Sequence, residues 1–200
     1  MWSCNSREQK LKDFRIQLIR AIVIDTVESP VIAFLCKFTN SSTADLYFGN
    51  RYYQETESFS GFLLFDSSLN NARVRLGSSL HSKHFMVRRG ESRHLLFVIS
   101  PISGDSTTRL FYTSAKNYYS SKHGNGWPFQ LIENSTFKYI SRVDQQGNKN
   151  VSHKSNDISY VDSTISIITN KIPVTYARDL LSEDAGRIVI ELDSISNSTR

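Results

Sequence analysis

Apolar and polar residues alternate in short runs along residues 13–99, and residues that favour turns separate the runs. Because successive side chains of a strand point to opposite faces, this alternation is typical of strands that are buried on one face. The spacing of the runs, roughly ten residues, predicts a sandwich or barrel of antiparallel strands. The predicted strands cover residues 14–24, 31–38, 46–48, 62–65, 73–76, 84–88 and 94–99.

The second half of the chain has a weaker pattern. Strands are predicted at residues 109–113, 130–132, 137–143, 159–161 and 165–168. Residues 120–128 are predicted to form an irregular loop, because they are rich in glycine and serine and end at a proline. Thr175 and Gly186 are residue types that begin and end helices, so a short C-terminal helix is predicted between them. Residues 187–192 then alternate as a closing strand, with Ile188, Ile190 and Leu192 on one face.

The composition also favours strands. The chain contains 30 serines, 12 phenylalanines and 9 tyrosines but only 7 alanines. Serine competes with the helix backbone for hydrogen bonds, whereas aromatic side chains suit a half-buried pleated surface. We therefore expect a polar tether at residues 1–12 and a single β-rich domain at residues 13–200. A sub-boundary near residues 100–105 is the alternative division.

The alternation also predicts which side chains share the interior. Phe34, Phe65 and Phe97 are expected to lie between the two layers. Cys36 falls on the same strand face as Phe34 and Phe38, so a small buried hydrophobe is its expected role. A thiol in such an apolar setting has a raised pKa, which argues against a nucleophilic cysteine.

The net charge of +5 does not indicate nucleic-acid binding. The basic residues are scattered singly along the chain, and the densest group contains only Arg88, Arg89 and Arg93. A nucleic-acid footprint is a stripe or patch with stacking aromatic rings on a known module. The sequence also lacks a run of about 18 apolar residues, so no membrane-spanning helix is predicted.

The sequence contains no complete catalytic or metal-binding motif. His81 and His84 are three residues apart, and in an extended segment this odd spacing places them on opposite faces. Neither a nucleophile elbow nor a glycine-rich phosphate loop occurs, so no cofactor or metal is expected. Glu55 and Glu57 share a strand face and could flank a sugar, but pairs of this kind are common on solvated strands.

Aromatic residues cluster in the segment with the weakest strand pattern, and they are the candidate binding residues. The cluster consists of Tyr112, Tyr118, Tyr119, Trp127 and Phe129. Tyrosine and tryptophan have a large apolar face and a polar group, which suits recognition of a protein or a glycan. In the alternative, the rings cover one open end of the sandwich.

The first six residues resemble the end of a bacterial lipoprotein signal peptide. In that family a small residue precedes a lipid-modified cysteine, and a polar tether follows. Ser3 matches the small residue and Cys4 the modified cysteine. Trp2 is bulkier than the usual residue at its position, and the basic and hydrophobic parts of a signal are missing. The resemblance implies a lipid anchor at Cys4; in the alternative, Cys4 is an incidental exposed cysteine.

Residues 13–99 resemble, in pattern only, the immunoglobulin-like domains of cell-envelope lipoproteins of the Bacteroidetes type. A strand leads into a polar turn at residues 38–42, and a turn at residues 90–92 leads into an aromatic-rich strand. The spacing of cysteine and tryptophan that marks antibody domains is absent. The resemblance implies a mainly β fold, an antiparallel immunoglobulin-like β-sandwich, with the short C-terminal helix added.

These observations lead to three functional hypotheses. The first is a non-enzymatic protein of the bacterial cell envelope, in the periplasm or on the outer membrane, that is anchored through Cys4 and binds a protein or a glycan. The second is a carbohydrate-active enzyme with carboxylates from distant strands, since catalytic groups converge in space rather than in sequence. The third is a structural subunit of a surface assembly. A cytoplasmic location is the alternative to the envelope.

Overall fold

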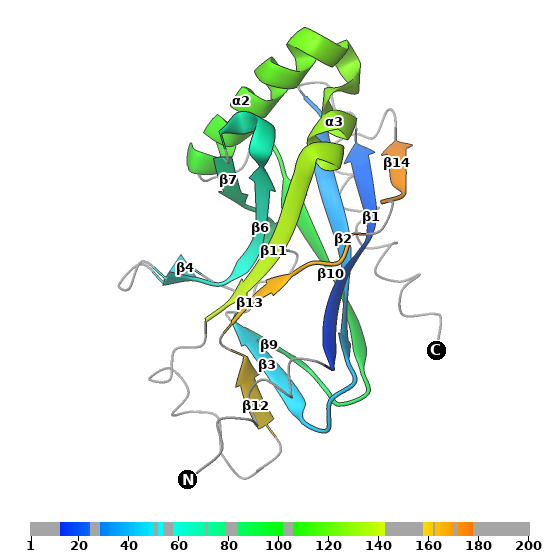
Figure 1. Ribbon diagram of the computed structural model, residues 1–200, viewed down its shortest axis with the longest axis vertical. Coiled ribbons are helices and arrows are strands. Elements are labelled where there is room, and N and C mark those ends of the chain that lie inside the picture. The colour runs from blue at the N-terminus through cyan, green and yellow to red at the C-terminus, as the bar shows by residue number, and fades with distance from the viewer. Residues whose placement is uncertain are drawn as a thin grey trace.

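The computed structural model describes residues 13–24, 29–49, 52–53, 58–70, 72–78, 84–101, 106–142, 158–161, 163–169 and 172–177. In this part of the chain the protein is mainly β, and most strand pairs are antiparallel. Two larger sheets face each other, and two helices lie across one end of them (Figure 1). The prediction of a β-rich architecture with two layers of mainly antiparallel strands is therefore confirmed.

The first sheet has the strand order β14-β1-β2-β10-β8. Its strands are β14 (Val174–Ala177), β1 (Phe14–Ile24), β2 (Val31–Asn40), β10 (Ser92–Ile99) and β8 (Gly77–Ser78). Only β14 runs parallel to its neighbour β1, and the other pairs are antiparallel.

The second sheet has the order β13-β11-β6-β7 and is antiparallel throughout. Its strands are β13 (Ser163–Ser166), β11 (Ser135–Ser141), β6 (Gly61–Asp66) and β7 (Ala72–Arg75). A small sheet is formed by β12 (Ile158–Val161), β3 (Asp45–Gly49) and β9 (His84–Val87), and β4 (Tyr52–Tyr53) pairs with β5 (Ser58–Phe59). The helices are η1 (Ser67–Leu69), α2 (Ser106–His123), η2 (Gly124–Gly126) and α3 (Trp127–Asn134).

All seven strands predicted within residues 13–99 are present, as β1, β2, β3, β6, β7, β9 and β10. The later predictions at 137–143, 159–161 and 165–168 coincide in large part with β11, β12 and β13. The short β4, β5, β8 and β14 were not predicted. Strands β4, β5 and β8 have two residues each, too few to show a period, and β14 includes the residue at which the C-terminal helix was predicted to begin.

The predicted strands at 109–113 and 130–132 and the predicted loop at 120–128 are wrong, because these residues belong to α2, η2 and α3. In α2 the buried positions are Thr108, Phe111, Tyr112, Ala115 and Tyr119, which recur every three or four residues and form one helical face. Pro128 lies in the first turn of α3, where proline removes no intrahelical hydrogen bond. It begins a helix here instead of marking a loop.

A β-bulge in β1 changes which residues face the interior. Leu18 pairs with Cys36 but Arg20 pairs with Leu35, so one extra residue is inserted at Ile19. Even-numbered residues face the core before the bulge, and odd-numbered residues face it afterwards. The continuous alternation expected up to Ile24 is therefore wrong, because the bulge turns the last part of β1 to the other face.

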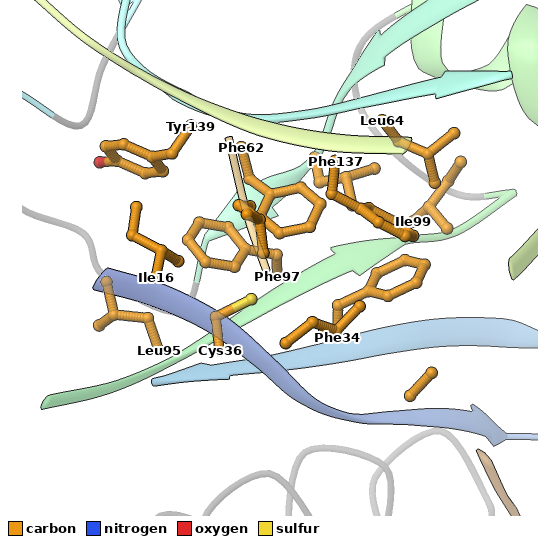
Figure 2. Packing of buried hydrophobic residues seen from close by; sticks show 14 of the residues in the cluster. Ile16, Phe34, Cys36, Phe62, Leu64, Leu95, Phe97, Ile99, Phe137 and Tyr139 are labelled. Carbon is orange, nitrogen blue, oxygen red and sulfur yellow. The ribbon is translucent and has the colours of Figure 1, made fainter. Parts of the chain in front are cut away.

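The main core lies between the two sheets and is dominated by phenylalanine. Phe34 from β2 and Phe97 from β10 face Phe62 and Phe137 of the second sheet (Figure 2). The rings of Phe62 and Phe97 are stacked with 4.7 Å between their centroids. Phe65 was expected in this core, but it lies half-buried on the outer face, where the Lys138 ammonium is 5.2 Å from its ring.

Cys36 occupies the predicted position on the inner face of β2. It is a free thiol, completely buried, in the same cluster as Phe34 and Phe38. Burial raises the pKa of the Cys36 thiol well above its ordinary value, because a thiolate would lose its hydration. The predicted role as a small buried hydrophobe is confirmed, and this environment makes Cys36 a poor nucleophile.

Gly49, at the end of β3, allows the small sheet to approach the second sheet. A Cβ atom at this position would overlap the Arg142 carbonyl oxygen and the Ser60 hydroxyl group. The Gly49 amide donates to Ser141 Oγ at 3.0 Å, and Tyr139 Oη donates to the Gly49 carbonyl at 2.7 Å. Both groups of the Gly49 backbone are thus bonded to β11.

The predicted C-terminal helix lies mostly outside the described residues. Its proposed first residue, Thr175, lies inside β14, so the helix does not begin there. Residues 178–186, the predicted closing strand at 187–192 and the tether at 1–12 all fall outside the described ranges.

Candidate functional site

Helices α2 and α3 close one end of the sandwich, and we call residues 106–134 the cap (Figure 1). The buried face of α2 joins the main core, and α3 contributes Trp127, Leu131 and Ile132 to it. Lys122 and His123 occupy the last turn of α2, where positive charge is favourable beside the negative end of the helix dipole.

Three hydrogen bonds attach the inner side of α2 to the strand connections at this end. Tyr112 Oη donates to the Pro30 carbonyl oxygen at 2.5 Å, and Lys116 Nζ donates to Ser29 Oγ at 3.0 Å. Tyr119 Oη donates to Asp66 Oδ2 at 2.8 Å. The cap is therefore fixed both to the first sheet, just before β2, and to the second sheet, at the end of β6.

Asp66 is a completely buried carboxyl group at the junction of β6 and η1. Its Oδ1 accepts the Ser68 amide at 2.8 Å, and its Oδ2 accepts the Tyr119 hydroxyl. A buried carboxylate is costly unless donors surround it, so these two bonds explain why it is tolerated. The pair serves to attach the cap, since neither oxygen has access to a substrate.

Burial raises the pKa of Tyr119 from 10.0 to about 12, and the neighbouring Asp66 carboxylate adds to the shift. In the unfolded chain the phenol ionises near pH 10. Since the folded-state pKa is the higher one, the contribution of Tyr119 to stability is complete below pH 10. It is lost as the pH rises from 10 to 12.

We therefore predict that the Tyr119→Phe variant loses about 1–3 kcal/mol of stability at neutral pH, because Asp66 loses a donor. Its stability should also fall less steeply than that of the wild type between pH 10 and 12. Denaturant unfolding of both proteins at several pH values tests this. Identical slopes for the two proteins over that pH range would show that Tyr119 does not ionise as the structure implies.

The five rings predicted to form a binding site do cluster, but most of them face inward. Tyr112, Tyr119 and Trp127 are buried, and the Tyr112 and Trp127 rings meet edge to face with 5.2 Å between centroids. Tyr118 and Phe129 are partly buried against the same core. The ring of Trp127 is only 3% exposed and fills the end of the sandwich.

The outer face of the cap has a different character. Leu110 is 70% exposed, and among the described residues only Ile168, at 44%, is another exposed large hydrophobic side chain. Thr113, Ser114 and Asn117 are exposed beside it on α2. Residues 106–132 contain three basic residues, Arg109, Lys116 and Lys122, and no aspartate or glutamate. On α2 this face combines an apolar centre with the exposed basic residues Arg109 and Lys122, whereas Lys116 points to the inner side and Glu133 is the acidic residue of the cap.

Tyr118 and Lys122 form a polar edge to this face. The Lys122 ammonium lies 4.0 Å from the centre of the Tyr118 ring, and it donates to Tyr118 Oη at 2.7 Å. The two residues are one helical turn apart, and their contact orients a half-exposed ring with a charge above it. Sequence reasoning selected Tyr118 but missed Leu110, which stood in a predicted strand. A helical interpretation of 106–123 would have placed Leu110 opposite the buried tyrosines.

The remaining sequence candidates do not add to this site. Cys4, Glu55, Glu57 and His81 lie outside the described ranges. His94 is half-buried in β10, where it pairs with Lys37 of β2. No group of three or more His, Cys, Asp or Glu residues that could hold a metal ion occurs among the described side chains.

Neither of the two described α-helices combines the length and the hydropathy that a membrane-spanning segment needs. The outer face of the cap is an exposed helical surface, and the buried groups beneath it fix its position on the two sheets. We therefore take this face as the candidate functional site. The chain matches no protein-family model, no curated protein and no solved structure.

Proposed function

We propose that the protein is a non-enzymatic binding protein, and that the outer face of the cap contacts a protein partner with an acidic surface. The observation that carries the proposal is the exposed Leu110 on α2, a helix that contains no acidic residue and has Arg109 and Lys122 among its exposed side chains. Arginine and tyrosine are enriched in protein interfaces, and apolar groups with complementary charges around them are typical of such surfaces.

A protein partner fits this face better than a glycan does. Glycan sites present flat aromatic faces on which sugar rings stack, and the large rings of the cap, Tyr112, Tyr119 and Trp127, point into the core. The exposed residues of α2 are short polar side chains around Leu110. They offer hydrogen-bonding groups around an apolar centre, which favours contact with another protein.

We also propose that the two facing sheets form an elaborated immunoglobulin-like sandwich. Such domains have the strand orders A-B-E-D in one sheet and G-F-C-C′ in the other. The orders β1-β2-β10-β8 and β13-β11-β6-β7 correspond to them strand by strand, and every pair involved is antiparallel. In this assignment the cap is an insertion between strands E and F, and β14 is an added strand beside A.

The proposed location is the bacterial cell envelope, with a lipid anchor at Cys4. The support for it is the Ser3–Cys4 pair followed by a polar stretch. A lipid-anchored binding protein needs a tether and an exposed contact face, and burial of each acyl CH₂ group contributes about 0.8 kcal/mol to anchoring.

We predict that the Leu110→Asp variant binds its partner at least about tenfold more weakly, because an acidic side chain replaces an apolar contact and opposes an acidic partner. The partner is first identified by cross-linking in envelope extracts of the native host, and its affinity for the purified full-length protein is then measured. Because Leu110 is exposed, the free energy of unfolding should change by no more than about 0.5 kcal/mol.

Ile168→Asp is the matched control, since Ile168 is the other exposed large hydrophobic side chain of the described residues and lies beside β1 instead of on the cap. The partner should bind this variant with wild-type affinity. Equal weakening by both variants, or weakening by Ile168→Asp alone, would place the interface elsewhere. If the wild type retained a glycan and neither variant did, the partner in the proposal would be a glycan instead of a protein.

A further inference from the structure

The outer face of the first sheet carries a second cluster of buried hydrophobic residues, separate from the main core. Its members are Ile22, Ile24, Ala33, Leu35 and Leu96, and each is between 1% and 8% exposed. The bulge at Ile19 turns Ile22 and Ile24 to this side, and the pairs Ile22–Ala33 and Leu35–Leu96 place the members next to one another.

The described elements do not explain this burial. The cluster and the hydrophobic residues packed against it, Ile19, Val31 and Val98, all belong to β1, β2 and β10. A sheet cannot bury its own face, because side chains stand away from the sheet and need a second layer above them. No described hydrophobic residue of another element is packed against the cluster to form such a layer.

The path of the chain indicates which residues supply this layer. Strand β14 pairs with β1 so that Ala177, its last residue, lies opposite Ile24, at the apolar end of the face. The chain enters β1 at the other end, where Phe14 pairs with Asn40. Residues 1–12 are thus joined to the end farthest from the cluster.

The charges agree with this path. The outward positions of β1 and β2 near their polar end include Arg15, Arg20 and Lys37. Residues 178–193 contain five carboxylates and two arginines, whereas residues 1–12 contain three basic residues and one glutamate. The C-terminal segment is attracted to this face and the N-terminal segment is repelled by it.

We propose that residues 178–193 pack over the outer face of the first sheet, with Ile188, Ile190 and Leu192 against the cluster. These three side chains alternate with polar or smaller neighbours, so an extended segment presents all of them to one side. Extended, the segment would span roughly 50 Å, while the three strands that carry the cluster are about 10 Å across. It is long enough to reverse direction after β14 and cross the cluster.

A thiol reporter in the full-length chain tests this packing. In a Cys4→Ser background, Leu96→Cys places a thiol in the cluster and Ser92→Cys places one at an exposed position of the same strand face. Cys36 stays unreactive as long as the core is intact. Maleimide should label the thiol at position 96 at least about 100-fold more slowly than the thiol at position 92, as expected for a site that reacts only after local opening.

Adding Ile188→Glu and Ile190→Glu should bring labelling at position 96 close to that at position 92, whereas Val189→Glu, on the opposite side of the segment, should leave it slow. If the double glutamate variant also exposes Cys36, the variant with Ile188→Ser and Ile190→Ser is used in its place.

Three results overturn the proposal. If labelling at position 96 is slow and only the variant with Trp2→Glu and Leu11→Glu makes it fast, residues 1–12 cover the cluster. If the slow labelling at position 96 becomes fast when the protein is diluted, a second copy of the chain covers the cluster. If labelling at position 96 is already fast in the protein without the glutamate substitutions, nothing covers it.

Discussion

Replacing Phe62 with alanine is expected to lower the free energy of unfolding by about 3–5 kcal/mol. Phe62 is completely buried, and its ring lies 4.7 Å from Phe97, 5.5 Å from Phe137 and 5.9 Å from Phe34, measured between centroids. These contacts join the two sheets, so the truncation removes apolar burial and leaves a cavity at the centre of the core. Denaturant unfolding of the purified variant measures the loss.

Phe65→Ala is the matched control in the same strand. Phe65 lies three residues further along β6, on the outer face, half-buried under Lys138. Its truncation should cost less than half as much, because water already reaches one side of the ring. Equal costs for the two variants would mean that β6 does not present Phe62 and Phe65 to opposite faces.

Trp127→Ala is expected to cost a similar amount, about 3–5 kcal/mol. Trp127 is 3% exposed at the start of α3 and packs against the buried Tyr112 ring. Removing the indole empties the space where α2, α3 and the end of the sandwich meet. Thermal or denaturant unfolding reports the loss.

The control for Trp127 is Phe129→Ala, since Phe129 is a partly buried ring in the same helix. We expect this variant to lose less stability than Trp127→Ala. A Trp127→Ala variant with wild-type stability would contradict the assignment of the indole to the core, and it would restore Trp127 as a displayed binding residue.

The strands of residues 13–99 could be predicted because each has one buried face, so period-two alternation survives in the sequence. Cys36 shows this, because counting every second residue along the strand is enough to place it on the same face as Phe34 and Phe38. Two details were hidden from such counting. The bulge at Ile19 reverses the alternation, and Phe65 sits in a run of four apolar residues in which the sequence does not reveal the inner face.

The cap was missed because α2 is built from residues with modest helix propensity. Its sequence is rich in serine, threonine and tyrosine, which favour turns and strands on propensity alone. Packing decides the outcome, since Phe111, Ala115 and Tyr119 form a helical stripe that fits the open end of the sandwich. The spacing of that stripe was present in the sequence, and a count at period 3.6 would have found it.

The sequence could not predict the orientation of the aromatic residues of the cap. The aromatic cluster was recognised, yet composition does not tell whether a tyrosine faces a partner or the core. Hydrogen bonds settle this for Tyr112 and Tyr119, whose hydroxyl groups reach Pro30 and Asp66. Because these rings point inward, the opposite face of α2, with Leu110, is exposed.

The cap closes the sandwich with its large rings inward and its outer face exposed. The fluorescence of Trp127 tests this arrangement most directly, and Trp2→Phe removes the other tryptophan. The folded protein should show blue-shifted emission, weakly quenched by acrylamide, that shifts to the red on unfolding. Red-shifted emission that is quenched as strongly as that of a free indole would contradict this arrangement.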